Sequence, residues 1–261
     1  MKQKSYAKVN IFLKITGLRG AYHEIASRFM IVKSLFDEIE FVKDDPMKFN
    51  LKGEFGCEVE QNSIYKAYLK LKEISPKVEE FFKIYSIKVS KNIPEFAGLG
   101  GGSSNCAAML NMCNNYIGLG LSKDELANIG ASIGADVAFF VYGYESANVS
   151  GIGEIVEQFE EKALDIEIFT PQIKCDTARV YQEFRANFYK TLSSDEQKLL
   201  FEKKSLEILD SFDIKEANDL YLPALVLQAK LEEIYQSFSN KGQEKVYFSG
   251  SGSSFFRIVN G

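Results

Sequence analysis

Histidine and cysteine are scarce in this chain of 261 residues, which holds one histidine and four cysteines. The cysteines show no CxxC spacing, and a single histidine excludes most patterns of zinc ligands. We therefore expect the four thiols to be buried small hydrophobic groups. They are Cys57, Cys106, Cys113 and Cys175. The spacing of Cys106 and Cys113 would place both on one face of a helix.

An excess of positive charge is also absent. The chain carries 31 Lys and Arg against 36 Asp and Glu, for a net charge of −5. This balance lacks the basic excess that usually accompanies nucleic-acid binding, so an anionic ligand must be held by local lysines, backbone amides or a metal ion. No segment approaches the roughly 18 apolar residues of a membrane-spanning helix. We expect a cytoplasmic protein that binds neither nucleic acid nor membrane.

The chain is nevertheless rich enough in apolar residues to form a core, with 46% hydrophobic residues and only five prolines. Its first half reads as short strands, followed by a strand at 84–90, a glycine-rich segment and a helix. Ser122, with Glu125 three residues later, predicts the start of another helix. The apolar run 137–142 reads as a buried strand, residues 194–209 as a polar helix, and the last two apolar runs as strands around the turn 249–254. We place a domain boundary near residue 155.

The glycine-rich segment, residues 94–105, is the strongest functional signal in the sequence, and we call it the glycine loop. Four glycines and two serines lie between a predicted strand and a predicted helix. Glycines let backbone N–H groups converge on an anion, and the start of a helix adds unpaired N–H groups and a positive dipole end. We therefore expect the loop to bind phosphate.

Three other interpretations of the glycine loop fit less well. A Walker P-loop ends in Gly-Lys-Ser/Thr, and no lysine lies inside this segment. A dinucleotide fingerprint requires a third glycine where Ser103 stands, and it belongs in a first βα unit. A flexible linker is rarely bounded on both sides by periodic apolar segments.

Lysine and asparagine occur together in the first apolar segment, residues 5–15. Lys8 and Asn10 fall on the same side of an alternating strand, with Val9, Ile11 and Leu13 on the other side. Taken alone, this pair favours a polar surface over a functional site.

Four separated stretches together resemble the GHMP kinases. They are residues 7–13 with Gly17 and Tyr22-His23-Glu24, residues 94–105, residues 133–137, and residues 249–252. Within that family, the Ala-Lys-x-Asn start followed by Tyr-His-Glu is most similar to the kinases that phosphorylate a cytidine diphosphate-linked methylerythritol. Such kinases act in the non-mevalonate pathway of isoprenoid biosynthesis.

This resemblance implies an α+β fold of two domains. Residues 1–155 would form an ATP-binding domain like domain 2 of ribosomal protein S5, and residues 156–261 a ferredoxin-like domain. It implies an ATP-dependent transferase that phosphorylates the 2-hydroxyl of the cytidine diphosphate-linked polyol, with ATP and Mg²⁺ as cofactors. The protein would be a monomer or a homodimer.

The resemblance also assigns roles to residues. It implies that Asp136 is the catalytic base and that Lys8 is its partner. Asn10, Tyr22, His23 and Tyr181 would bind the cytidine substrate, with aromatic rings stacking on the base and the imidazole bonding its polar edge. Ser103 would also contact Mg²⁺. The expected ATP-binding residues are Asn62, Lys91, Pro94, Glu95, Phe96, Ala97, Gly98, Leu99, Gly100, Gly101, Gly102, Ser103 and Ser104.

Two departures from the family pattern leave alternatives open. Ala21 replaces the glycine usual before Tyr-His, and residues 95–97 are bulkier and more acidic than the small residues common there. A related kinase of homoserine or mevalonate, a nucleotide-binding protein without turnover, and a Rossmann-type oxidoreductase are the alternative functions.

Overall fold

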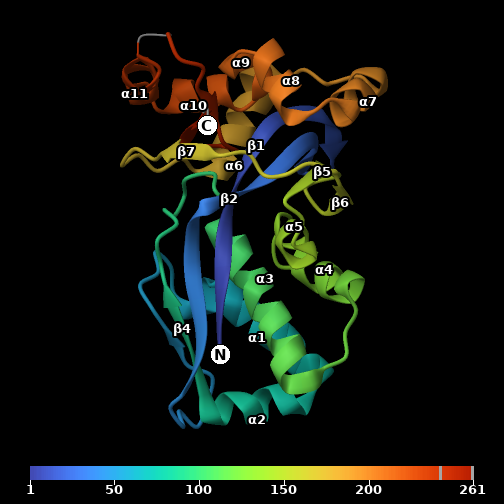
Figure 1. Ribbon diagram of the computed structural model, residues 1–261, viewed down its shortest axis with the longest axis vertical. Coiled ribbons are helices and arrows are strands. Elements are labelled where there is room, and N and C mark those ends of the chain that lie inside the picture. Colours follow the sequence, from blue (N-terminus) through green and yellow to red (C-terminus); the bar gives the residue numbers. More distant parts are fainter. Residues whose placement is uncertain (241–242, 260–261) are drawn as a thin grey trace. The chain divides into compact units, whose positions relative to one another are not determined.

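The computed structural model describes residues 1–240 and 243–259 and combines helices with strands, which confirms the predicted α+β class (Figure 1). Its chain groups into two compact units, each made of three segments. The first unit comprises Met1–Ala7, Leu35–Ile93 and Gly100–Gly143, and the second comprises Lys8–Ser34, Pro94–Leu99 and the segment from Tyr144 onward. Because these segments interleave along the chain, they locate no single cut, and the boundary near residue 155 stays a prediction.

The chain begins with two long strands, β1 (Lys2–Arg19) and β2 (Tyr22–Lys43), which pair with each other. The prediction of short strands is wrong here. Neither strand contains proline, and β2 contains no glycine. Polar residues such as Lys8 and Arg28 are buried inside these strands and do not end them.

In the first unit, the end of β2 lies beside β4 (Tyr85–Ser90) (Figure 1). The two strands pair antiparallel, with Ile39 opposite Val89, and β3 (Leu51–Lys52) lies parallel to β4. The predicted strand at 84–90 is thus confirmed. Helix α3 packs against α1 and α5, and α4 packs against α5. The helices of this unit are α1 (Ser63–Ile74), α2 (Pro76–Ile84), α3 (Gly101–Cys113), α4 (Lys123–Ala131) and α5 (Val137–Tyr142), with short η1 (Val59–Gln61) and η2 (Asn114–Gly118).

Two predicted helix starts in this unit are confirmed. Helix α3 begins within the glycine loop, after Gly100 in a left-handed conformation with φ of 70°. Helix α4 begins after Ser122, whose hydroxyl accepts a bond from the Glu125 amide while the Glu125 carboxylate accepts one from the Ser122 amide. This reciprocal capping satisfies amides that the first helical turn leaves unpaired.

The buried strand predicted at 137–142 is wrong, because these residues form helix α5. A short apolar run carries no decisive period, so burial alone cannot separate a strand from a buried helix. The helix ends at Gly143, which has a φ of 76° and closes the last turn as a left-handed cap.

In the second unit, residues Ser27–Met30 of β2 pair antiparallel with β5 (Ser146–Ser150), which pairs in turn with β6 (Ile155–Gln158). A separate three-stranded sheet has the order β7-β9-β8. Its members are β7 (Ile166–Phe169), β8 (Tyr247–Phe248) and β9 (Phe255–Ile258), so the two terminal strands around the turn 249–254 are confirmed.

The rest of the second unit also contains helices. The single helix predicted at 194–209 is interrupted, because Lys203 and Lys204 are extended and the Ser205 amide donates to the Glu161 carboxylate. The helices are α6 (Thr177–Glu183), η3 (Phe184–Phe188), α7 (Ser194–Glu202), α8 (Ser205–Ser211), α9 (Ile214–Ala217), α10 (Tyr221–Leu227) and α11 (Lys230–Phe238). No helix among the described residues is long and apolar enough to cross a membrane.

Three of the four cysteines are buried, as predicted. Cys106 and Cys113 lie in α3, and burial raises the pKa of the Cys106 thiol to about 12, so it stays protonated. The prediction is wrong for Cys57, which is exposed in the segment between β3 and η1. Among the described residues, no group of three or more His, Cys, Asp or Glu side chains is placed to hold a metal ion.

Candidate active site

Strand β1 supplies a buried polar chain in the second unit. The Lys8 ammonium donates to Asn10 Oδ1 at 2.7 Å, and Asn10 Nδ2 donates to Ser27 Oγ at 2.9 Å. Ser27 donates in turn to the Phe12 carbonyl. Lys8 and Asn10 share one side of the strand as predicted, yet they are only 3% and 2% exposed, which excludes a solvated surface. The hydrogen bonds that link Lys8, Asn10 and Ser27 therefore hold each donor in a fixed orientation.

The single histidine lies against aromatic rings of η3 and α6. His23, on β2, is 8% exposed, and its ring centroid is 5.1 Å from that of Tyr181 and 5.9 Å from that of Phe184. Its buried Nε2 atom has no hydrogen-bond partner among the described residues. Burial and the charge of Arg185 lower the pKa of His23, so the imidazole is neutral at pH 7. It can offer one donor and one acceptor to a ligand.

The neighbouring Tyr22 differs in burial from His23. Its side chain is 66% exposed at the start of β2, where successive side chains alternate between the two faces of the strand. The structure thus brings His23 and Tyr181 together and leaves Tyr22 at the surface.

The first part of the glycine loop, Pro94–Leu99, is tied to two other segments of the second unit. The Lys8 amide donates to the Leu99 carbonyl at 3.0 Å. We call residues 249–254 the terminal turn; the Ser249 hydroxyl donates to the Gly98 carbonyl at 3.0 Å. Gly98 has a φ of +75°, and a Cβ there would lie 2.1 Å from the Ser249 carbonyl oxygen, so only glycine permits this close approach.

The terminal turn also lies near the buried polar chain. A Cβ built on Gly250 would stand 3.5 Å from Asn10 Oδ1. The Ser251 and Thr177 hydroxyls are hydrogen-bonded at 2.8 Å, which links the turn to the start of α6. The turn, Asn10 and the first part of the glycine loop therefore form one cluster.

The second part of the glycine loop opens α3 in the first unit. A Cβ on Gly101 would lie 2.9 Å from Ile93 Cγ2 and 3.5 Å from the Lys91 ammonium, so Lys91 stands beside the first turn of α3. The Ser63 hydroxyl donates to the Gly102 carbonyl at 2.8 Å, and the preceding Asn62 caps α1 by accepting from the Ile64 amide. The structure thus gathers Lys91, Asn62 and the helical end of the loop around helix N–H groups suited to an anion.

Asp136 lies in the turn that leads into α5, where its side chain makes no capping hydrogen bond to that helix. A Cβ on Gly134, two residues earlier, would be 3.8 Å from Ser103 Oγ. Ser103 and the turn that carries Asp136 are therefore neighbours within the first unit.

Magnesium fits this part of the chain only as a partner of bound phosphate. Mg²⁺ usually keeps several waters and takes one or two protein ligands together with substrate phosphates. Ser103 offers a hydroxyl at the start of α3, beside the N–H groups expected to hold phosphate. That donor set agrees with a magnesium ion delivered on a nucleotide.

Sequence reasoning missed Ser27 and Phe184. Ser27 is a fully buried polar residue within an apolar strand, and this was a detectable signal. Phe184 follows Tyr181 by three residues, the spacing that places two rings on one helix face.

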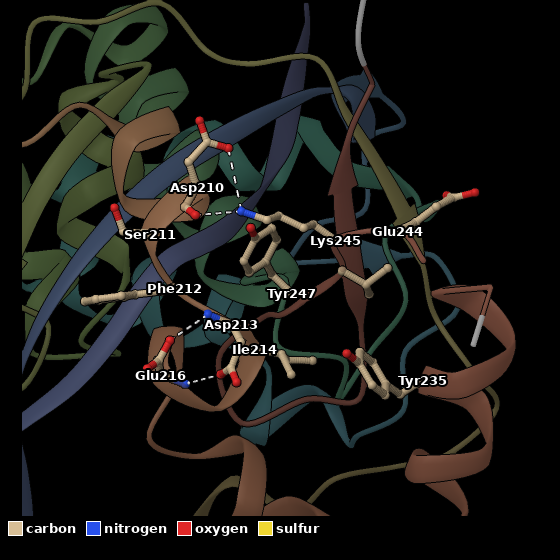
Figure 2. Close-up of a pocket in the computed structure, with 11 residues that line it drawn as sticks. Asp210, Ser211, Phe212, Asp213, Ile214, Glu216, Tyr235, Glu244, Lys245 and Tyr247 are labelled. Carbon is tan, nitrogen blue, oxygen red and sulfur yellow. Dashed lines mark hydrogen bonds and ion pairs between the residues drawn. The ribbon is translucent and has the colours of Figure 1, made fainter. Parts of the chain in front are cut away.

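A pocket of about 350 Å³ elsewhere in the second unit is a poor candidate for the site (Figure 2). Of the described residues that line it, none is a predicted site residue. Its polar groups have structural partners: Asp213 accepts from the amides of Lys215 and Glu216, and Lys245 donates to the Asp210 carbonyl. These charged side chains therefore stabilise the fold through hydrogen bonds to the protein itself.

Comparison with known proteins agrees with the motifs. Residues 62–144 match the family described as GHMP kinases N terminal domain. A relative from Sulfurimonas denitrificans is 52% identical over 261 residues, covering 98% of this chain and 96% of the relative, and is named 4-diphosphocytidyl-2-C-methyl-D-erythritol kinase. The chain belongs to the 4-diphosphocytidyl-2-C-methyl-D-erythritol kinase family. The resemblance to GHMP kinases predicted from the four stretches is confirmed.

Two further members of this kinase family support the assignment. One, from a Sulfurovum species, is 47% identical and covers 97% of each chain. A crystal structure of 4-(cytidine 5'-diphospho)-2C-methyl-D-erythritol kinase is 27% identical, with a TM-score of 0.76, and covers all of this chain and 91% of that one. Membership in a kinase family implies the use of ATP.

Proposed function

We propose that this protein transfers the γ-phosphoryl group of ATP to the 2-hydroxyl of 4-diphosphocytidyl-2-C-methyl-D-erythritol. The observation that carries the proposal is the full-length similarity to kinases of that name, at up to 52% identity. The reaction would supply the non-mevalonate pathway of isoprenoid synthesis. A cytoplasmic location and a monomeric or homodimeric state are part of the same proposal.

The surroundings of His23 support a cytosine-bearing substrate. A neutral imidazole with a buried Nε2 atom that lacks a protein partner is suited to bond the polar edge of a pyrimidine. The ring of Tyr181 beside it would add a stacking surface. Tyr22, which is exposed in this structure, would have to turn toward His23 to stack on the base. Asn10 would bind the polyol part of the substrate.

The glycine loop supports the ATP half of the reaction. Its N–H groups at the start of α3 would hold the phosphates, Asn62 and Lys91 would bind the nucleotide, and Ser103 would contact magnesium. When bound, magnesium would neutralise charge on the phosphates.

The chemical roles of Asp136 and Lys8 follow from the family resemblance. The acceptor hydroxyl oxygen forms a bond to the γ-phosphorus while the bond from that phosphorus to the bridging oxygen breaks, and ADP leaves. Asp136 orients the hydroxyl and takes its proton as the transition state forms. The Lys8 ammonium stabilises the oxygen as it loses that proton.

Product measurement tests the proposal. Purified protein with Mg-ATP should release ADP when the cytidine diphosphate-linked substrate is added, and should release little with homoserine or mevalonate. Release with homoserine or mevalonate alone would keep the kinase family and refute the substrate. A failure of all three substrates, with ATP still bound, would favour a nucleotide-binding protein without turnover.

Asp136→Asn tests the catalytic role. Removal of the base should lower kcat by at least about 100-fold, because general base catalysis typically contributes that much. ATP affinity, measured by calorimetry, should stay within about twofold, since the proposed role lies in the chemical step. A variant with wild-type kcat would contradict the assignment.

A further inference from the structure

A buried carboxylate lies at the base of the glycine loop. Asp37, within β2 and just before the residues that pair with β4, is 0% exposed. Each of its oxygens accepts two hydrogen bonds from described residues. Oδ1 accepts from the amides of Asn92 and Ile93 at 2.7 and 2.8 Å, and Oδ2 accepts from Lys91 Nζ and Asn105 Nδ2 at 2.5 and 2.9 Å.

The four donors to Asp37 come from both ends of the glycine loop. Residues 91–93 immediately precede the loop, and Asn105 is its last residue, within α3. One carboxylate therefore fixes the two points at which the chain enters and leaves the loop.

The bond to Lys91 has a direct bearing on a ligand. The Lys91 ammonium would be 3.5 Å from a Cβ on Gly101, so Asp37 holds it beside the first turn of α3. An ammonium carries three donors, and the bond to Asp37 uses one of them. Lysine has a long flexible stem, and fixing its head beforehand lowers the entropy cost of ligand binding.

The burial of Asp37 itself requires such a set of donors. A buried carboxylate is costly unless it is paired and hydrogen-bonded, and here one cation and three neutral donors stabilise it. An apolar residue at this buried position of β2 would need none of these donors.

We propose that Asp37 is a positioning residue for the nucleotide: it holds the Lys91 ammonium and both ends of the glycine loop in the arrangement that receives the phosphates. Asp37 acts through these groups and does not contact the ligand. This inference rests on the proposed binding of ATP at the glycine loop.

Asp37→Asn is the primary test. The asparagine keeps the shape of the side chain and an acceptor for the two amides. It loses the charge that holds Lys91, and its NH₂ group faces the donor groups of Lys91 and Asn105. The KM for ATP should rise about tenfold, the effect of losing one charge-assisted hydrogen bond. The kcat and the KM for the cytidine substrate should stay within about twofold, since neither depends on these contacts.

Asp44→Asn is the matched control. Asp44 also lies in the first unit and pairs with a lysine, Lys52, at 2.5 Å, but its side chain bonds Lys52 and Ser86 and not the glycine loop or Lys91. Its substitution removes the same charge and should leave the KM for ATP unchanged.

Asn105→Ala keeps the proposal testable if Asp37→Asn does not fold. Asn105 Oδ1 has no partner among the described residues, so the alanine loses only the described Nδ2 bond to Asp37. The KM for ATP should rise about threefold, less than in Asp37→Asn, because one donor to the carboxylate is lost while Lys91 and the two amides still hold it.

Three results would overturn the role of Asp37. They are a folded Asp37→Asn protein with wild-type KM for ATP, an equal change in both KM values and kcat, and an Asn105→Ala protein with unchanged KM for ATP. A wild-type protein that releases no ADP refutes the proposed function instead. Binding of an ATP analogue to each variant, measured by calorimetry, then tests the role of Asp37 independently of turnover.

Discussion

At the scale of single residues, the informative groups are polar side chains in places where the sequence pattern predicts none. Lys8 and Asn10 have the spacing of a solvated strand face, yet both are buried and hydrogen-bonded to each other. His23 is buried against two aromatic rings. Burial fixes the orientation of all three side chains and lowers the pKa of His23, and both effects are useful in a binding site.

The protonation of His23 gives a prediction about pH. Burial first, and the charge of Arg185 second, lower its pKa below the ordinary histidine value of 6.5. Because the folded pKa lies below the unfolded one, the unfolded chain binds the proton first as the pH falls. The contribution of this residue to stability is therefore complete above pH 6.5 and is lost as the pH falls from there toward the folded pKa.

Nuclear magnetic resonance can measure this directly, because His23 is the only histidine of the chain. Its imidazole signal should titrate below pH 6.5. The free energy of unfolding should fall more between pH 7.5 and 5.5 in the wild type than in His23→Gln. The substitution leaves every carboxylate of the protein in place, so the difference between the two proteins reports His23 alone. A signal that titrates at or above 6.5 would contradict the neutral buried imidazole.

At the scale of elements, the terminal turn depends on one amide. Asn218 Nδ2 donates to the carbonyls of both Phe248 and Gly250 at 2.9 Å, and all three residues are buried. The turn carries Ser249, which bonds to Gly98 in the glycine loop. The Asn218 side chain thus holds two carbonyls at the start of the turn that contacts the glycine loop.

Asn218→Ala should lower the free energy of unfolding by about 2–4 kcal/mol, because two buried carbonyls lose their donor. Denaturant unfolding measures the change. Asn187→Ala is the control: Asn187 bonds Glu183 on an exposed part of η3, and its loss should cost no more than about 0.5 kcal/mol. Equal losses in the free energy of unfolding would show that the buried Asn218 hydrogen bonds stabilise the protein no more than an exposed hydrogen bond does.

Elements with a local signal could be predicted from the sequence. The Ser122 and Glu125 pair marked the start of α4, and the glycine loop marked the start of α3. The run 137–142 could not be resolved, since six apolar residues pack equally well as a strand or as a buried helix. Tertiary contacts decided that case. The pairing of β1 with β2 likewise extends both strands beyond the short lengths that were predicted.

The candidate site likewise has residues that the sequence indicated and residues that only the folded structure reveals. Family motifs located the glycine loop, Lys8, His23 and Asp136. They could not reveal Asp37 or Ser27, because each acts through a hydrogen bond to a residue distant in the sequence. Pairings of that kind exist only after the chain has folded.

At the scale of the whole molecule, both compact units draw on separated parts of the chain. The C-terminal segment bonds to β1 within the second unit: the Asp219 amide donates to the Leu13 carbonyl, and the Leu192 amide to the Ile15 carbonyl. The predicted boundary near residue 155 would therefore mark a family domain and not an independently folding piece.

Fragment expression tests this interpretation. Residues 156–261 made alone should show no cooperative thermal transition, because they lack β1, β2 and β5. Circular dichroism on heating would report it, with the full chain as the control. A sharp transition in the isolated fragment would show that the cut at 155 separates true folding units.

The interleaving of the second unit also has a consequence on the ribosome. Residues 8–34 are made early, but β5, which pairs with them, is made only after the segments 35–93 and 100–143. At about 5–20 residues per second, that delay is on the order of ten seconds. For that interval the apolar residues 27–30 of β2 are without the strand that pairs with them. Newly made chains are therefore in need of a chaperone while the middle of the protein is being synthesised.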